Sequence, residues 1–200
     1  MPSRATTQRS RTSATTRAHI LDVAHELFYW HGIRATGVDA IAKAADVAPT
    51  TLYRLFDSKD ELVGAYVERA ADLYREWFEE ALGPVEDPAR VRILRLFAAL
   101  QQQVQPEQCR GCPFLMALSE LPDPDHPGHR YAVELKQWVR KRFTRLAREL
   151  PGTPSASAAR KLGDQLMLVF EGVYASAQAL TASGPPRAAV RMVDDLLPSG

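Results

Sequence analysis

The sequence predicts an all-α protein made of a small N-terminal head and a larger helical body. Apolar residues recur at the i, i+3, i+4, i+7 spacing of an amphipathic helix in about nine segments. None of these segments shows the strict apolar–polar alternation that is typical of a β-strand. Proline, glycine and capping residues separate the segments. With 200 residues, 46% of them hydrophobic, the chain can bury a sizeable core.

Basic residues gather at the N-terminus, although the formal net charge is only +1. The segment 1–15 contains Arg4, Arg9 and Arg11 and has no apolar periodicity. Two interpretations stay open for this segment: a disordered, solubilising tail, or a basic arm that follows DNA phosphates or a minor groove. Because the net charge is small, any affinity for nucleic acid must come from local patches.

Neither a membrane span nor a secretory signal is expected. No apolar run approaches the roughly 20 residues that a membrane helix needs. The basic N-terminus is not followed by the hydrophobic segment of a signal peptide. We therefore expect a cytoplasmic protein.

The first three predicted helices are close together in the sequence. Residues 16–31 carry apolar side chains at helical spacing, and a glycine follows them. Residues 38–45 form the next apolar stripe, a short turn interrupts it, and the stripe resumes over 49–56. Pro49 suits the first position of a helix, where its missing N–H costs nothing. This is the pattern of a helix-turn-helix whose second helix enters a major groove.

The second helix of this motif presents polar side chains on its outer sides. Thr50 and Thr51 lie near its N-terminal end, which reaches base edges in this geometry. Tyr53 and Lys59 are expected to bind phosphates, whereas Arg54 meets either phosphate or solvent. Thr36 has the chemistry of an N-cap and of a phosphate ligand. The predicted DNA-binding residues are Thr36, Gly37, Val38, Ala48, Pro49, Thr50, Thr51, Tyr53, Arg54 and Lys59.

An ordered set of residues across these helices carries a family resemblance. The set is Ile20 through Phe28, Gly32, Thr36, Ile41-Ala42, Ala45, Val47, Thr51-Leu52-Tyr53, Phe56, and Lys59 with Glu61-Leu62. With it, the segment 16–68 resembles the tetracycline-repressor (TetR) family. The resemblance implies a helix-turn-helix DNA-binding domain over 16–62, preceded by the disordered basic arm 1–15. It further implies an effector-binding and dimerisation domain over 63–200.

The sequence departs from the family pattern in and after the turn. Asp46 stands where family members commonly have glycine, because the backbone there is left-handed; aspartate is one of the few other residues that tolerate this conformation. Ala48 and Pro49 offer no hydrogen-bonding side chain at the start of the recognition helix. Base reading must then depend on Thr50, Thr51, the backbone, or contacts with thymine methyl groups.

The body is predicted to consist of six more helices, over 58–82, 87–104, 114–121, 131–150, 157–182 and 186–197. Ser58 and Glu61 match a capping box at the start of the first one. The basic charges of 131–150 are interpreted as a solvated face rather than a second DNA-binding element. The resemblance makes an apolar effector pocket plausible among these helices, with plain core packing as the alternative for each aromatic residue. The candidate lining residues are Tyr66, Trp77, Phe97, Phe114, Trp138, Phe170 and Tyr174.

The last two predicted helices are the candidate dimer surface. They carry apolar stripes, and small residues such as Gly163 and Gly172 let helices approach closely. Two helices from each chain would form a four-helix interface. Two linked heads would then read half-sites about 34 Å apart, or a multiple of that distance. The candidate interface residues are Leu162, Leu166, Val169, Val173, Val190, Val193 and Leu197.

Cys109 and Cys112 form a C-x-x-C pair that is followed by His126 and His129. The set loosely matches a zinc site, but the histidine spacing is one residue short of the usual range, and the intervening segment has a helical pattern. A redox thiol pair is a second interpretation, and ordinary residues of a loop at a pocket edge are a third. No metal and no cofactor are expected.

Together, these features predict a sequence-specific DNA-binding transcriptional regulator. We expect a homodimeric repressor that a small, partly apolar effector releases from a near-palindromic operator. The alternatives are an activator of the same fold, and a helical adaptor that binds proteins without DNA specificity. An enzyme is not expected, because no nucleophile–base constellation, phosphate loop or close carboxylate pair is recognisable.

Overall fold

The computed structural model describes residues 13–107 and 109–198, and all regular structure in these ranges is helical. The predicted all-α class is therefore confirmed. The head contains α1 (Ser13–His31), α2 (Val38–Ala44) and α3 (Pro49–Leu55). The body contains α4 (Lys59–Leu82), α5 (Ala89–Gln103), α6 (Pro113–Glu120), α7 (Pro127–Glu149), α8 (Ala156–Leu180), the 3-10 helix η1 (Pro185–Ala188) and α9 (Ala189–Leu196).

The segment 1–15, predicted to be a basic arm, is described only from residue 13. Residues 13–15 belong to α1, which starts three residues earlier than predicted, and the rest of the arm lies outside the described residues. Within the described ranges, each helix is too short or too polar to cross a membrane.

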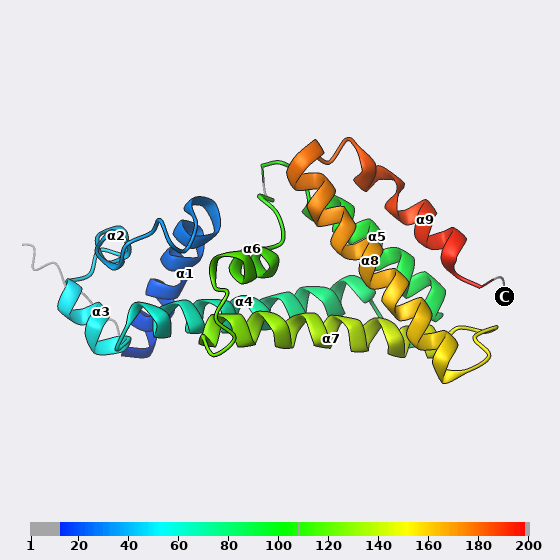
Figure 1. Ribbon diagram of the computed structural model, residues 1–200, viewed down its shortest axis with the longest axis horizontal. Helices are drawn as coiled ribbons and strands as arrows, with labels where there is room; N and C mark the ends of the chain where they lie inside the picture. The colour runs from blue at the N-terminus through cyan, green and yellow to red at the C-terminus, as the bar shows by residue number, and fades with distance from the viewer. Residues whose placement is uncertain (1–12, 108, 199–200) are drawn as a thin grey trace, which may run out of the picture.

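The molecule is elongated, with the head at one end (Figure 1). α4 leaves the head and runs along the body beside α7, in the same direction, and α8 also packs against α7. α5 packs against α4 and α9. Because α4 is continuous, the domain boundary predicted at residue 62 falls inside a helix and not in a linker.

An aromatic cluster forms the core of the body, with one phenylalanine from each of four helices. Phe78 of α4, Phe97 of α5, Phe143 of α7 and Phe170 of α8 are fully buried. Neighbouring ring centroids are 5.4–5.9 Å apart, which is a favourable separation for aromatic pairs. Burial of each such side chain contributes about 1.5–3 kcal/mol. The cluster therefore fixes the four helices relative to one another.

Glycines allow α7 to approach α4 and α8 closely. A Cβ added at Gly64 of α4 would lie 2.8 Å from Cβ of Pro127, at the start of α7. A Cβ added at Gly163 of α8 would lie 2.8 Å from the backbone nitrogen of Thr144 on α7. Carbon atoms in optimal contact are about 3.5–4.0 Å apart, so both contacts require glycine. Gly163 was predicted at a dimer contact, but it serves packing within the chain.

Ion pairs engage much of the basic helix α7. Lys136 and Arg140 bind Glu171 and Asp164 on α8, each at 2.6 Å, and Arg142 binds a carboxylate of α4. Pairs at exposed positions contribute only about 0–1 kcal/mol each. These side chains are therefore not simply solvated, as the sequence suggested; they also orient α7 between its neighbours.

Candidate DNA-binding surface and ligand cavity

The turn of the helix-turn-helix depends on Asp46, whose φ of 53° lies in the left-handed region. Aspartate visits this region more readily than most residues, and the predicted left-handed turn at Asp46 is confirmed. The amide of Asp46 donates to the carbonyl of Lys43 at 3.2 Å, and the amide of Val47 donates to that of Ala42 at 3.0 Å. These bonds close α2 and set the direction in which α3 leaves the turn.

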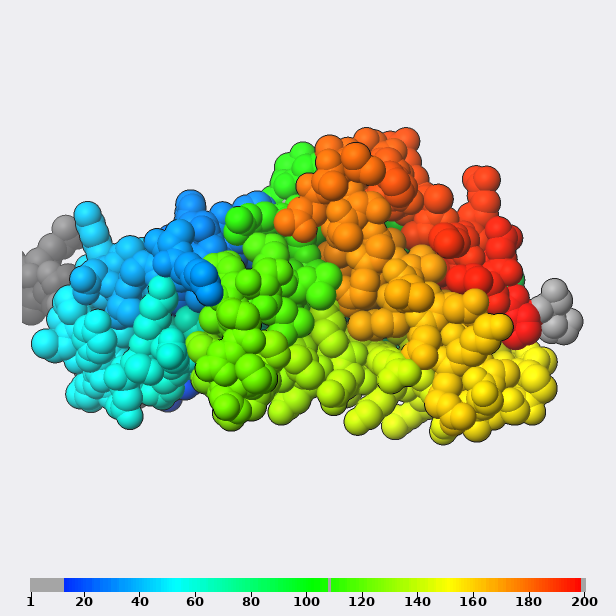
Figure 2. All heavy atoms as spheres, in the orientation of Figure 1, coloured from blue at the N-terminus to red at the C-terminus, as the bar shows by residue number. Residues whose placement is uncertain are grey.

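α3 presents Thr50, Tyr53 and Arg54 to solvent, and Tyr53 is 51% exposed. Leu52 points into the head and is 1% exposed. Thr51 is half-buried and so offers less of its side chain than Thr50 does. The space-filling view places α3 at the free end of the molecule, where no part of the body covers its visible side (Figure 2). The outer face of α3 is therefore open for contact with DNA.

Thr36 has a structural role in the head rather than the predicted N-cap role. Its side chain is buried, and its hydroxyl donates to the carbonyl of Gly32 at 2.8 Å, with the carbonyl of Leu27 at 3.3 Å. Gly37 precedes α2, and no side chain caps that helix. Because the Thr36 hydroxyl proton is directed to α1, a phosphate at this point would meet backbone N–H groups instead.

The start of α4 is capped as predicted. The Ser58 hydroxyl accepts from the amide of Glu61 at 3.1 Å. In return, the Glu61 carboxylate accepts from the amide of Asp57 at 2.6 Å. Lys59, half-buried, follows as the first residue of α4. The capping bonds hold this lysine at a fixed place beside the recognition helix.

A cavity of about 250 Å³ lies where the head meets the body. His25 and Tyr29 of α1 form one side, and Leu73, Tyr74 and Trp77 of α4 form another. The remaining lining residues are Ala70 of α4, Gln103 of α5, Cys109, Gly111 and Pro113 before or at the start of α6, Phe114 of α6 and Tyr174 of α8. A molecule in this cavity would therefore touch the head directly.

A hydrogen-bonded chain runs along the cavity wall. The hydroxyls of Tyr74 and Tyr174 are 3.3 Å apart, and the Tyr174 hydroxyl donates to Oε1 of Gln103 at 2.7 Å. Burial raises the pKa of both phenols well above the ordinary value, so both stay protonated. Burial also lowers the pKa of His25, which favours its neutral form. The wall is thus polar and aromatic, and these titratable groups favour their uncharged forms.

Three of the seven aromatic residues predicted for the pocket line this cavity: Trp77, Phe114 and Tyr174. Phe97 and Phe170 do not, because both are fully buried in the aromatic cluster. Helical periodicity shows that these side chains face inward, but it does not distinguish a packed core from a cavity wall.

Tyr66 and Trp138 do not line this cavity either. Tyr66 packs against Phe28 of the head, with ring centroids 5.3 Å apart. Trp138 packs against Phe78 of the aromatic cluster, also at 5.3 Å.

The sequence reasoning missed the cavity residues of α1. His25 and Tyr29 are one helical turn apart, and that i, i+4 spacing could have marked a second inward-facing stripe on α1.

Hydrogen bonds of Tyr29 join α1 to the loop that leads into α6, and we call them the Tyr29 latch. The Tyr29 hydroxyl accepts from the amides of Arg110 and Gly111 at 2.7 and 3.3 Å and donates to the carbonyl of Gly111 at 3.0 Å. The Arg110 guanidinium donates to the carbonyl of Tyr29 at 2.8 Å. A second contact joins Arg34 to Glu120 at the end of α6, at 2.8 and 3.0 Å. The head is therefore tied to the body beside the cavity.

Comparison with known proteins agrees with the helix-turn-helix geometry of the head. Residues 20–66 match the family model of bacterial regulatory proteins of the tetR family. A tetR-transcriptional regulator of known structure from Streptomyces avermitilis is 31% identical, with 91% of this chain and 97% of that chain covered and a TM-score of 0.76. The chain belongs to the TetR family.

Two further relatives extend the match over nearly the whole chain. A TetR-family transcriptional regulator from Streptomyces coelicolor is 28% identical, covers 90% of this chain and 93% of its own, and has a TM-score of 0.82. The HTH-type transcriptional regulator YjdC of Escherichia coli is 24% identical over 181 residues, which are 90% of this chain and 93% of YjdC. The protein is therefore a DNA-binding transcriptional regulator with the TetR fold.

The cysteines and histidines of this TetR-family body do not gather around one point. The Sγ of Cys112 is buried and accepts from Nζ of Lys136 at 3.0 Å. His129 contacts a backbone carbonyl at 2.7 Å, and His126 accepts from a backbone amide at 3.0 Å. Residues 13–107 and 109–198 contain no group of three or more metal-binding side chains. Cys109 lines the cavity, as the interpretation of a pocket-edge loop suggested.

An apolar groove of about 340 Å³ runs between α8 and the segment of η1 and α9. Leu168 of α8 and Met192 of α9 border it and are 73% and 54% exposed. Val169 and Gly172 also line it. Exposed apolar side chains that cluster in this way mark an interaction surface.

Five of the seven residues predicted for the dimer interface are buried within the protomer, although one of them, Val173, also lines the groove. α8 and α9 each carry a broad apolar stripe. Most of each stripe packs on other helices of the same chain. The buried residues are Leu162, Leu166, Val173, Val193 and Leu197. Val169 and Val190 are half-buried and remain near the surface. The outward positions that the sequence reasoning missed are Leu168 and Met192, which fall between the buried positions of their helices.

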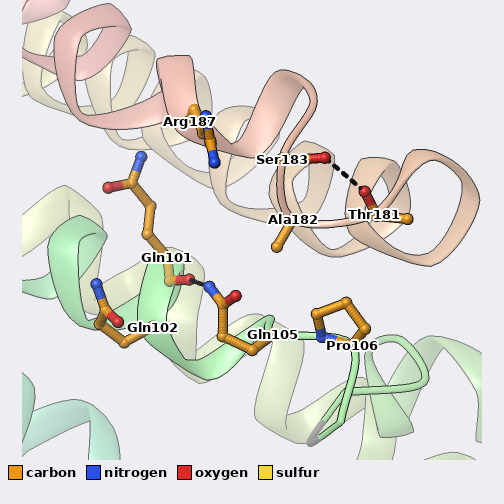
Figure 3. Close-up of a pocket in the computed structure, with 8 residues that line it drawn as sticks. All are labelled: Gln101, Gln102, Gln105, Pro106, Thr181, Ala182, Ser183 and Arg187. Atoms are coloured by element: carbon orange, nitrogen blue, oxygen red, sulfur yellow. Dashed lines mark hydrogen bonds between the residues drawn. The ribbon is translucent and has the colours of Figure 1, made fainter.

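A polar pocket, also of about 340 Å³, lies between the end of α5 and the turn after α8 (Figure 3). The amide of Gln101 donates to the carbonyl of Pro186 at 2.7 Å, and Gln105 donates to the carbonyl of Gln101 at 2.8 Å. Figure 3 shows Arg187 and Thr181 on the opposite side from these glutamines. The bond from Gln101 fastens η1 to α5, so this pocket is a junction that positions α9 beside the apolar groove.

Proposed function

We propose that this regulator is a homodimeric repressor that leaves its operator when a small molecule enters the cavity between α1, α4 and α8. One observation supports this most strongly: His25 and Tyr29 of the DNA-binding head share the cavity wall with Trp77 and Tyr174 of the body. A molecule that binds one arrangement of head and body more tightly shifts the population toward that arrangement. Because its partner is DNA, we place the protein in the cytoplasm.

For the DNA contacts, we assign the outer face of α3 to the major groove. Thr50 reaches the base edges, and the exposed Tyr53 and Arg54 reach the phosphates on either side. Lys59 adds a point charge to a phosphate. The backbone amides at Gly37 and Val38, at the start of α2, bind a further phosphate in place of the Thr36 hydroxyl. Ala48 and Pro49 then contact thymine methyl groups or no base at all.

The groove beside Leu168 and Met192 would seat the same helices of a second copy, related by a two-fold axis. Pairing of these helices would bury two exposed apolar side chains on each copy. The two heads would then bind a near-palindromic operator, with half-sites about one helical turn apart or a multiple of it.

The test of DNA binding is retardation of the fragment that carries the protein's own promoter, measured at several salt concentrations. Affinity for this fragment should exceed affinity for a scrambled fragment and fall steeply as salt rises. Equal affinity for both fragments would reject the proposal in favour of a protein without DNA specificity.

Lys59→Ala should weaken binding to both fragments alike. Each lost phosphate contact lowers the slope of log K against log salt by about 0.9, so a dimer that loses two contacts should lose about 1.8. Lys161→Ala removes an exposed cation of α8 far from the head and serves as the control. If both variants keep the wild-type slope, Lys59 does not contact a phosphate.

A further inference from the structure

The cavity is lined by side chains that carry no formal charge. Neither a lysine, an arginine, an aspartate nor a glutamate is among its lining residues. Two cations lie next to the wall without lining it. The Arg110 guanidinium donates to the backbone carbonyl of Tyr29 at 2.8 Å, and Lys136, 5.8 Å from the ring centroid of Phe114, pairs with Glu171 at 2.6 Å. A charged ligand would lose its hydration here without meeting an opposite charge in the lining itself, which is unfavourable. The lining therefore selects an uncharged molecule.

Aromatic rings make up much of the wall. The rings of Tyr74 and Trp77 are 5.3 Å apart and inclined at 51°. The ring of Phe114 stands nearly edge-on to Tyr74, at 5.3 Å and 80°. Flat faces and edges at these angles accept another ring by offset stacking or edge-to-face contact. The shape of the wall thus favours a flat aromatic molecule over a flexible chain.

The polar chain at the wall leaves a hydrogen-bond donor for the ligand. Oε1 of Gln103 already accepts from Tyr174, so the group that Gln103 has left to offer is its NH₂. Among the described residues, no protein acceptor takes a hydrogen from this NH₂ group. A ligand oxygen that accepts this hydrogen bond would add direction to the apolar contacts.

The volume limits the size of the molecule. A cavity of about 150 Å³ holds benzene, and pockets that bind drug-sized ligands measure roughly 300–1,000 Å³. The 250 Å³ available here lies between these values. We propose that the effector is an uncharged aromatic molecule of one or two rings that carries an acceptor oxygen. This inference rests on the proposed role of the cavity as the effector site.

The test uses three probes with the same ring system: 2-naphthol, which is uncharged at neutral pH, 2-naphthoate and 2-naphthylmethylammonium. Their binding to the full chain without DNA is measured by titration calorimetry. We expect 2-naphthol to bind at least tenfold more tightly than either charged probe. Equal or tighter binding of a charged probe, or no binding of 2-naphthol, would overturn the inference.

A matched pair of variants then locates the binding. Gln103→Leu removes the proposed donor, whereas Gln102→Leu changes an exposed neighbour that does not line this cavity. Gln103→Leu should weaken 2-naphthol binding about five- to tenfold, and Gln102→Leu should leave it unchanged. An equal effect of both variants would show that 2-naphthol binds elsewhere. Urea unfolding of both variants checks that neither effect comes from a loss of folding.

Failure of the ligand class can be distinguished from failure of the proposed function. If 2-naphthol binds the wild type more tightly than Gln103→Leu, and 2-naphthol does not change operator retardation, the ligand class is supported and the effector role fails. If a charged probe releases the operator while 2-naphthol does not bind, the effector role holds and the class fails.

Discussion

Loss of the Tyr29 hydroxyl should loosen the head from the body without unfolding either of them. Tyr29→Phe keeps the ring that lines the cavity and removes three hydrogen bonds, to the amides of Arg110 and Gly111 and to the carbonyl of Gly111. The bond from the Arg110 guanidinium to the backbone of Tyr29 is retained. The variant therefore tests the latch and leaves the apolar contacts in place.

The size of the effect follows from the three lost bonds. A typical hydrogen bond contributes about 0.5–1.5 kcal/mol net. The Arg110 amide lies at an exposed site and the Gly111 amide at a partly buried one, so water replaces part of the loss. We therefore expect the latch to weaken by about 1–2 kcal/mol, a factor of about 5 to 30. Allosteric coupling energies are typically about 1–3 kcal/mol, so the latch is large enough to carry much of the proposed coupling between the cavity and the DNA-binding head.

Hydrogen exchange measures this effect without a ligand. The amides of Arg110 and Gly111 should exchange about 5- to 30-fold faster in Tyr29→Phe, while the core of α7 keeps its protection. Tyr131→Phe removes a phenol that does not line the cavity and should change neither. If the two loop amides exchange at the wild-type rate in Tyr29→Phe, the hydroxyl does not hold the loop and the reasoning is wrong.

Three further outcomes are expected. Thr50→Ala should change the preference for particular base pairs more than Thr51→Ala, because Thr50 is exposed and Thr51 is half-buried; a panel of single-base-pair operator variants measures this. Gly163→Ala should lower the free energy of unfolding in urea by about 1–3 kcal/mol, because the new Cβ overpacks the α7 backbone; unchanged stability would show that α7 and α8 separate freely. Leu168→Glu should convert the dimer to monomers in light scattering, and Val85→Glu, equally exposed but outside the groove, should not.

The sequence was sufficient to predict the fold class and the head because their signals are local. The capping pair at Ser58 and Glu61, the proline at the start of α3 and the left-handed Asp46 each act within a few residues. The buried position of Leu52 follows from helical spacing alone. Thr36 was predicted less well, because its hydroxyl bonds to the end of α1, and a threonine before a helix looks the same whether or not it caps that helix.

The cavity and the groove were harder to predict from the sequence. A helix such as α8 has apolar residues on more than one face, and the sequence alone does not show which face packs on another helix and which is left to line a cavity or groove. Phe170 and Tyr174 are one turn apart on α8, yet the first is in the core and the second lines the cavity. Leu168 lies between buried positions of the same helix and faces solvent. The crossing of α8 over α7 decides these cases, and that crossing depends on Gly163, whose partner is about twenty residues away in the sequence.

If α4 turns about its close contact with Pro127 at Gly64, it acts as a lever with unequal arms. At 1.5 Å per residue, Lys59 lies about 7.5 Å from this pivot and Trp77 about 20 Å from it on the other side. A sideways movement of α4 at the cavity would therefore reach the DNA end reduced to about two-fifths of its size. A movement of Tyr29 at the cavity is not reduced in this way, because α1 itself belongs to the head. Under the proposed function, a small ligand would thus move the recognition helices more effectively by displacing α1 than by tilting α4.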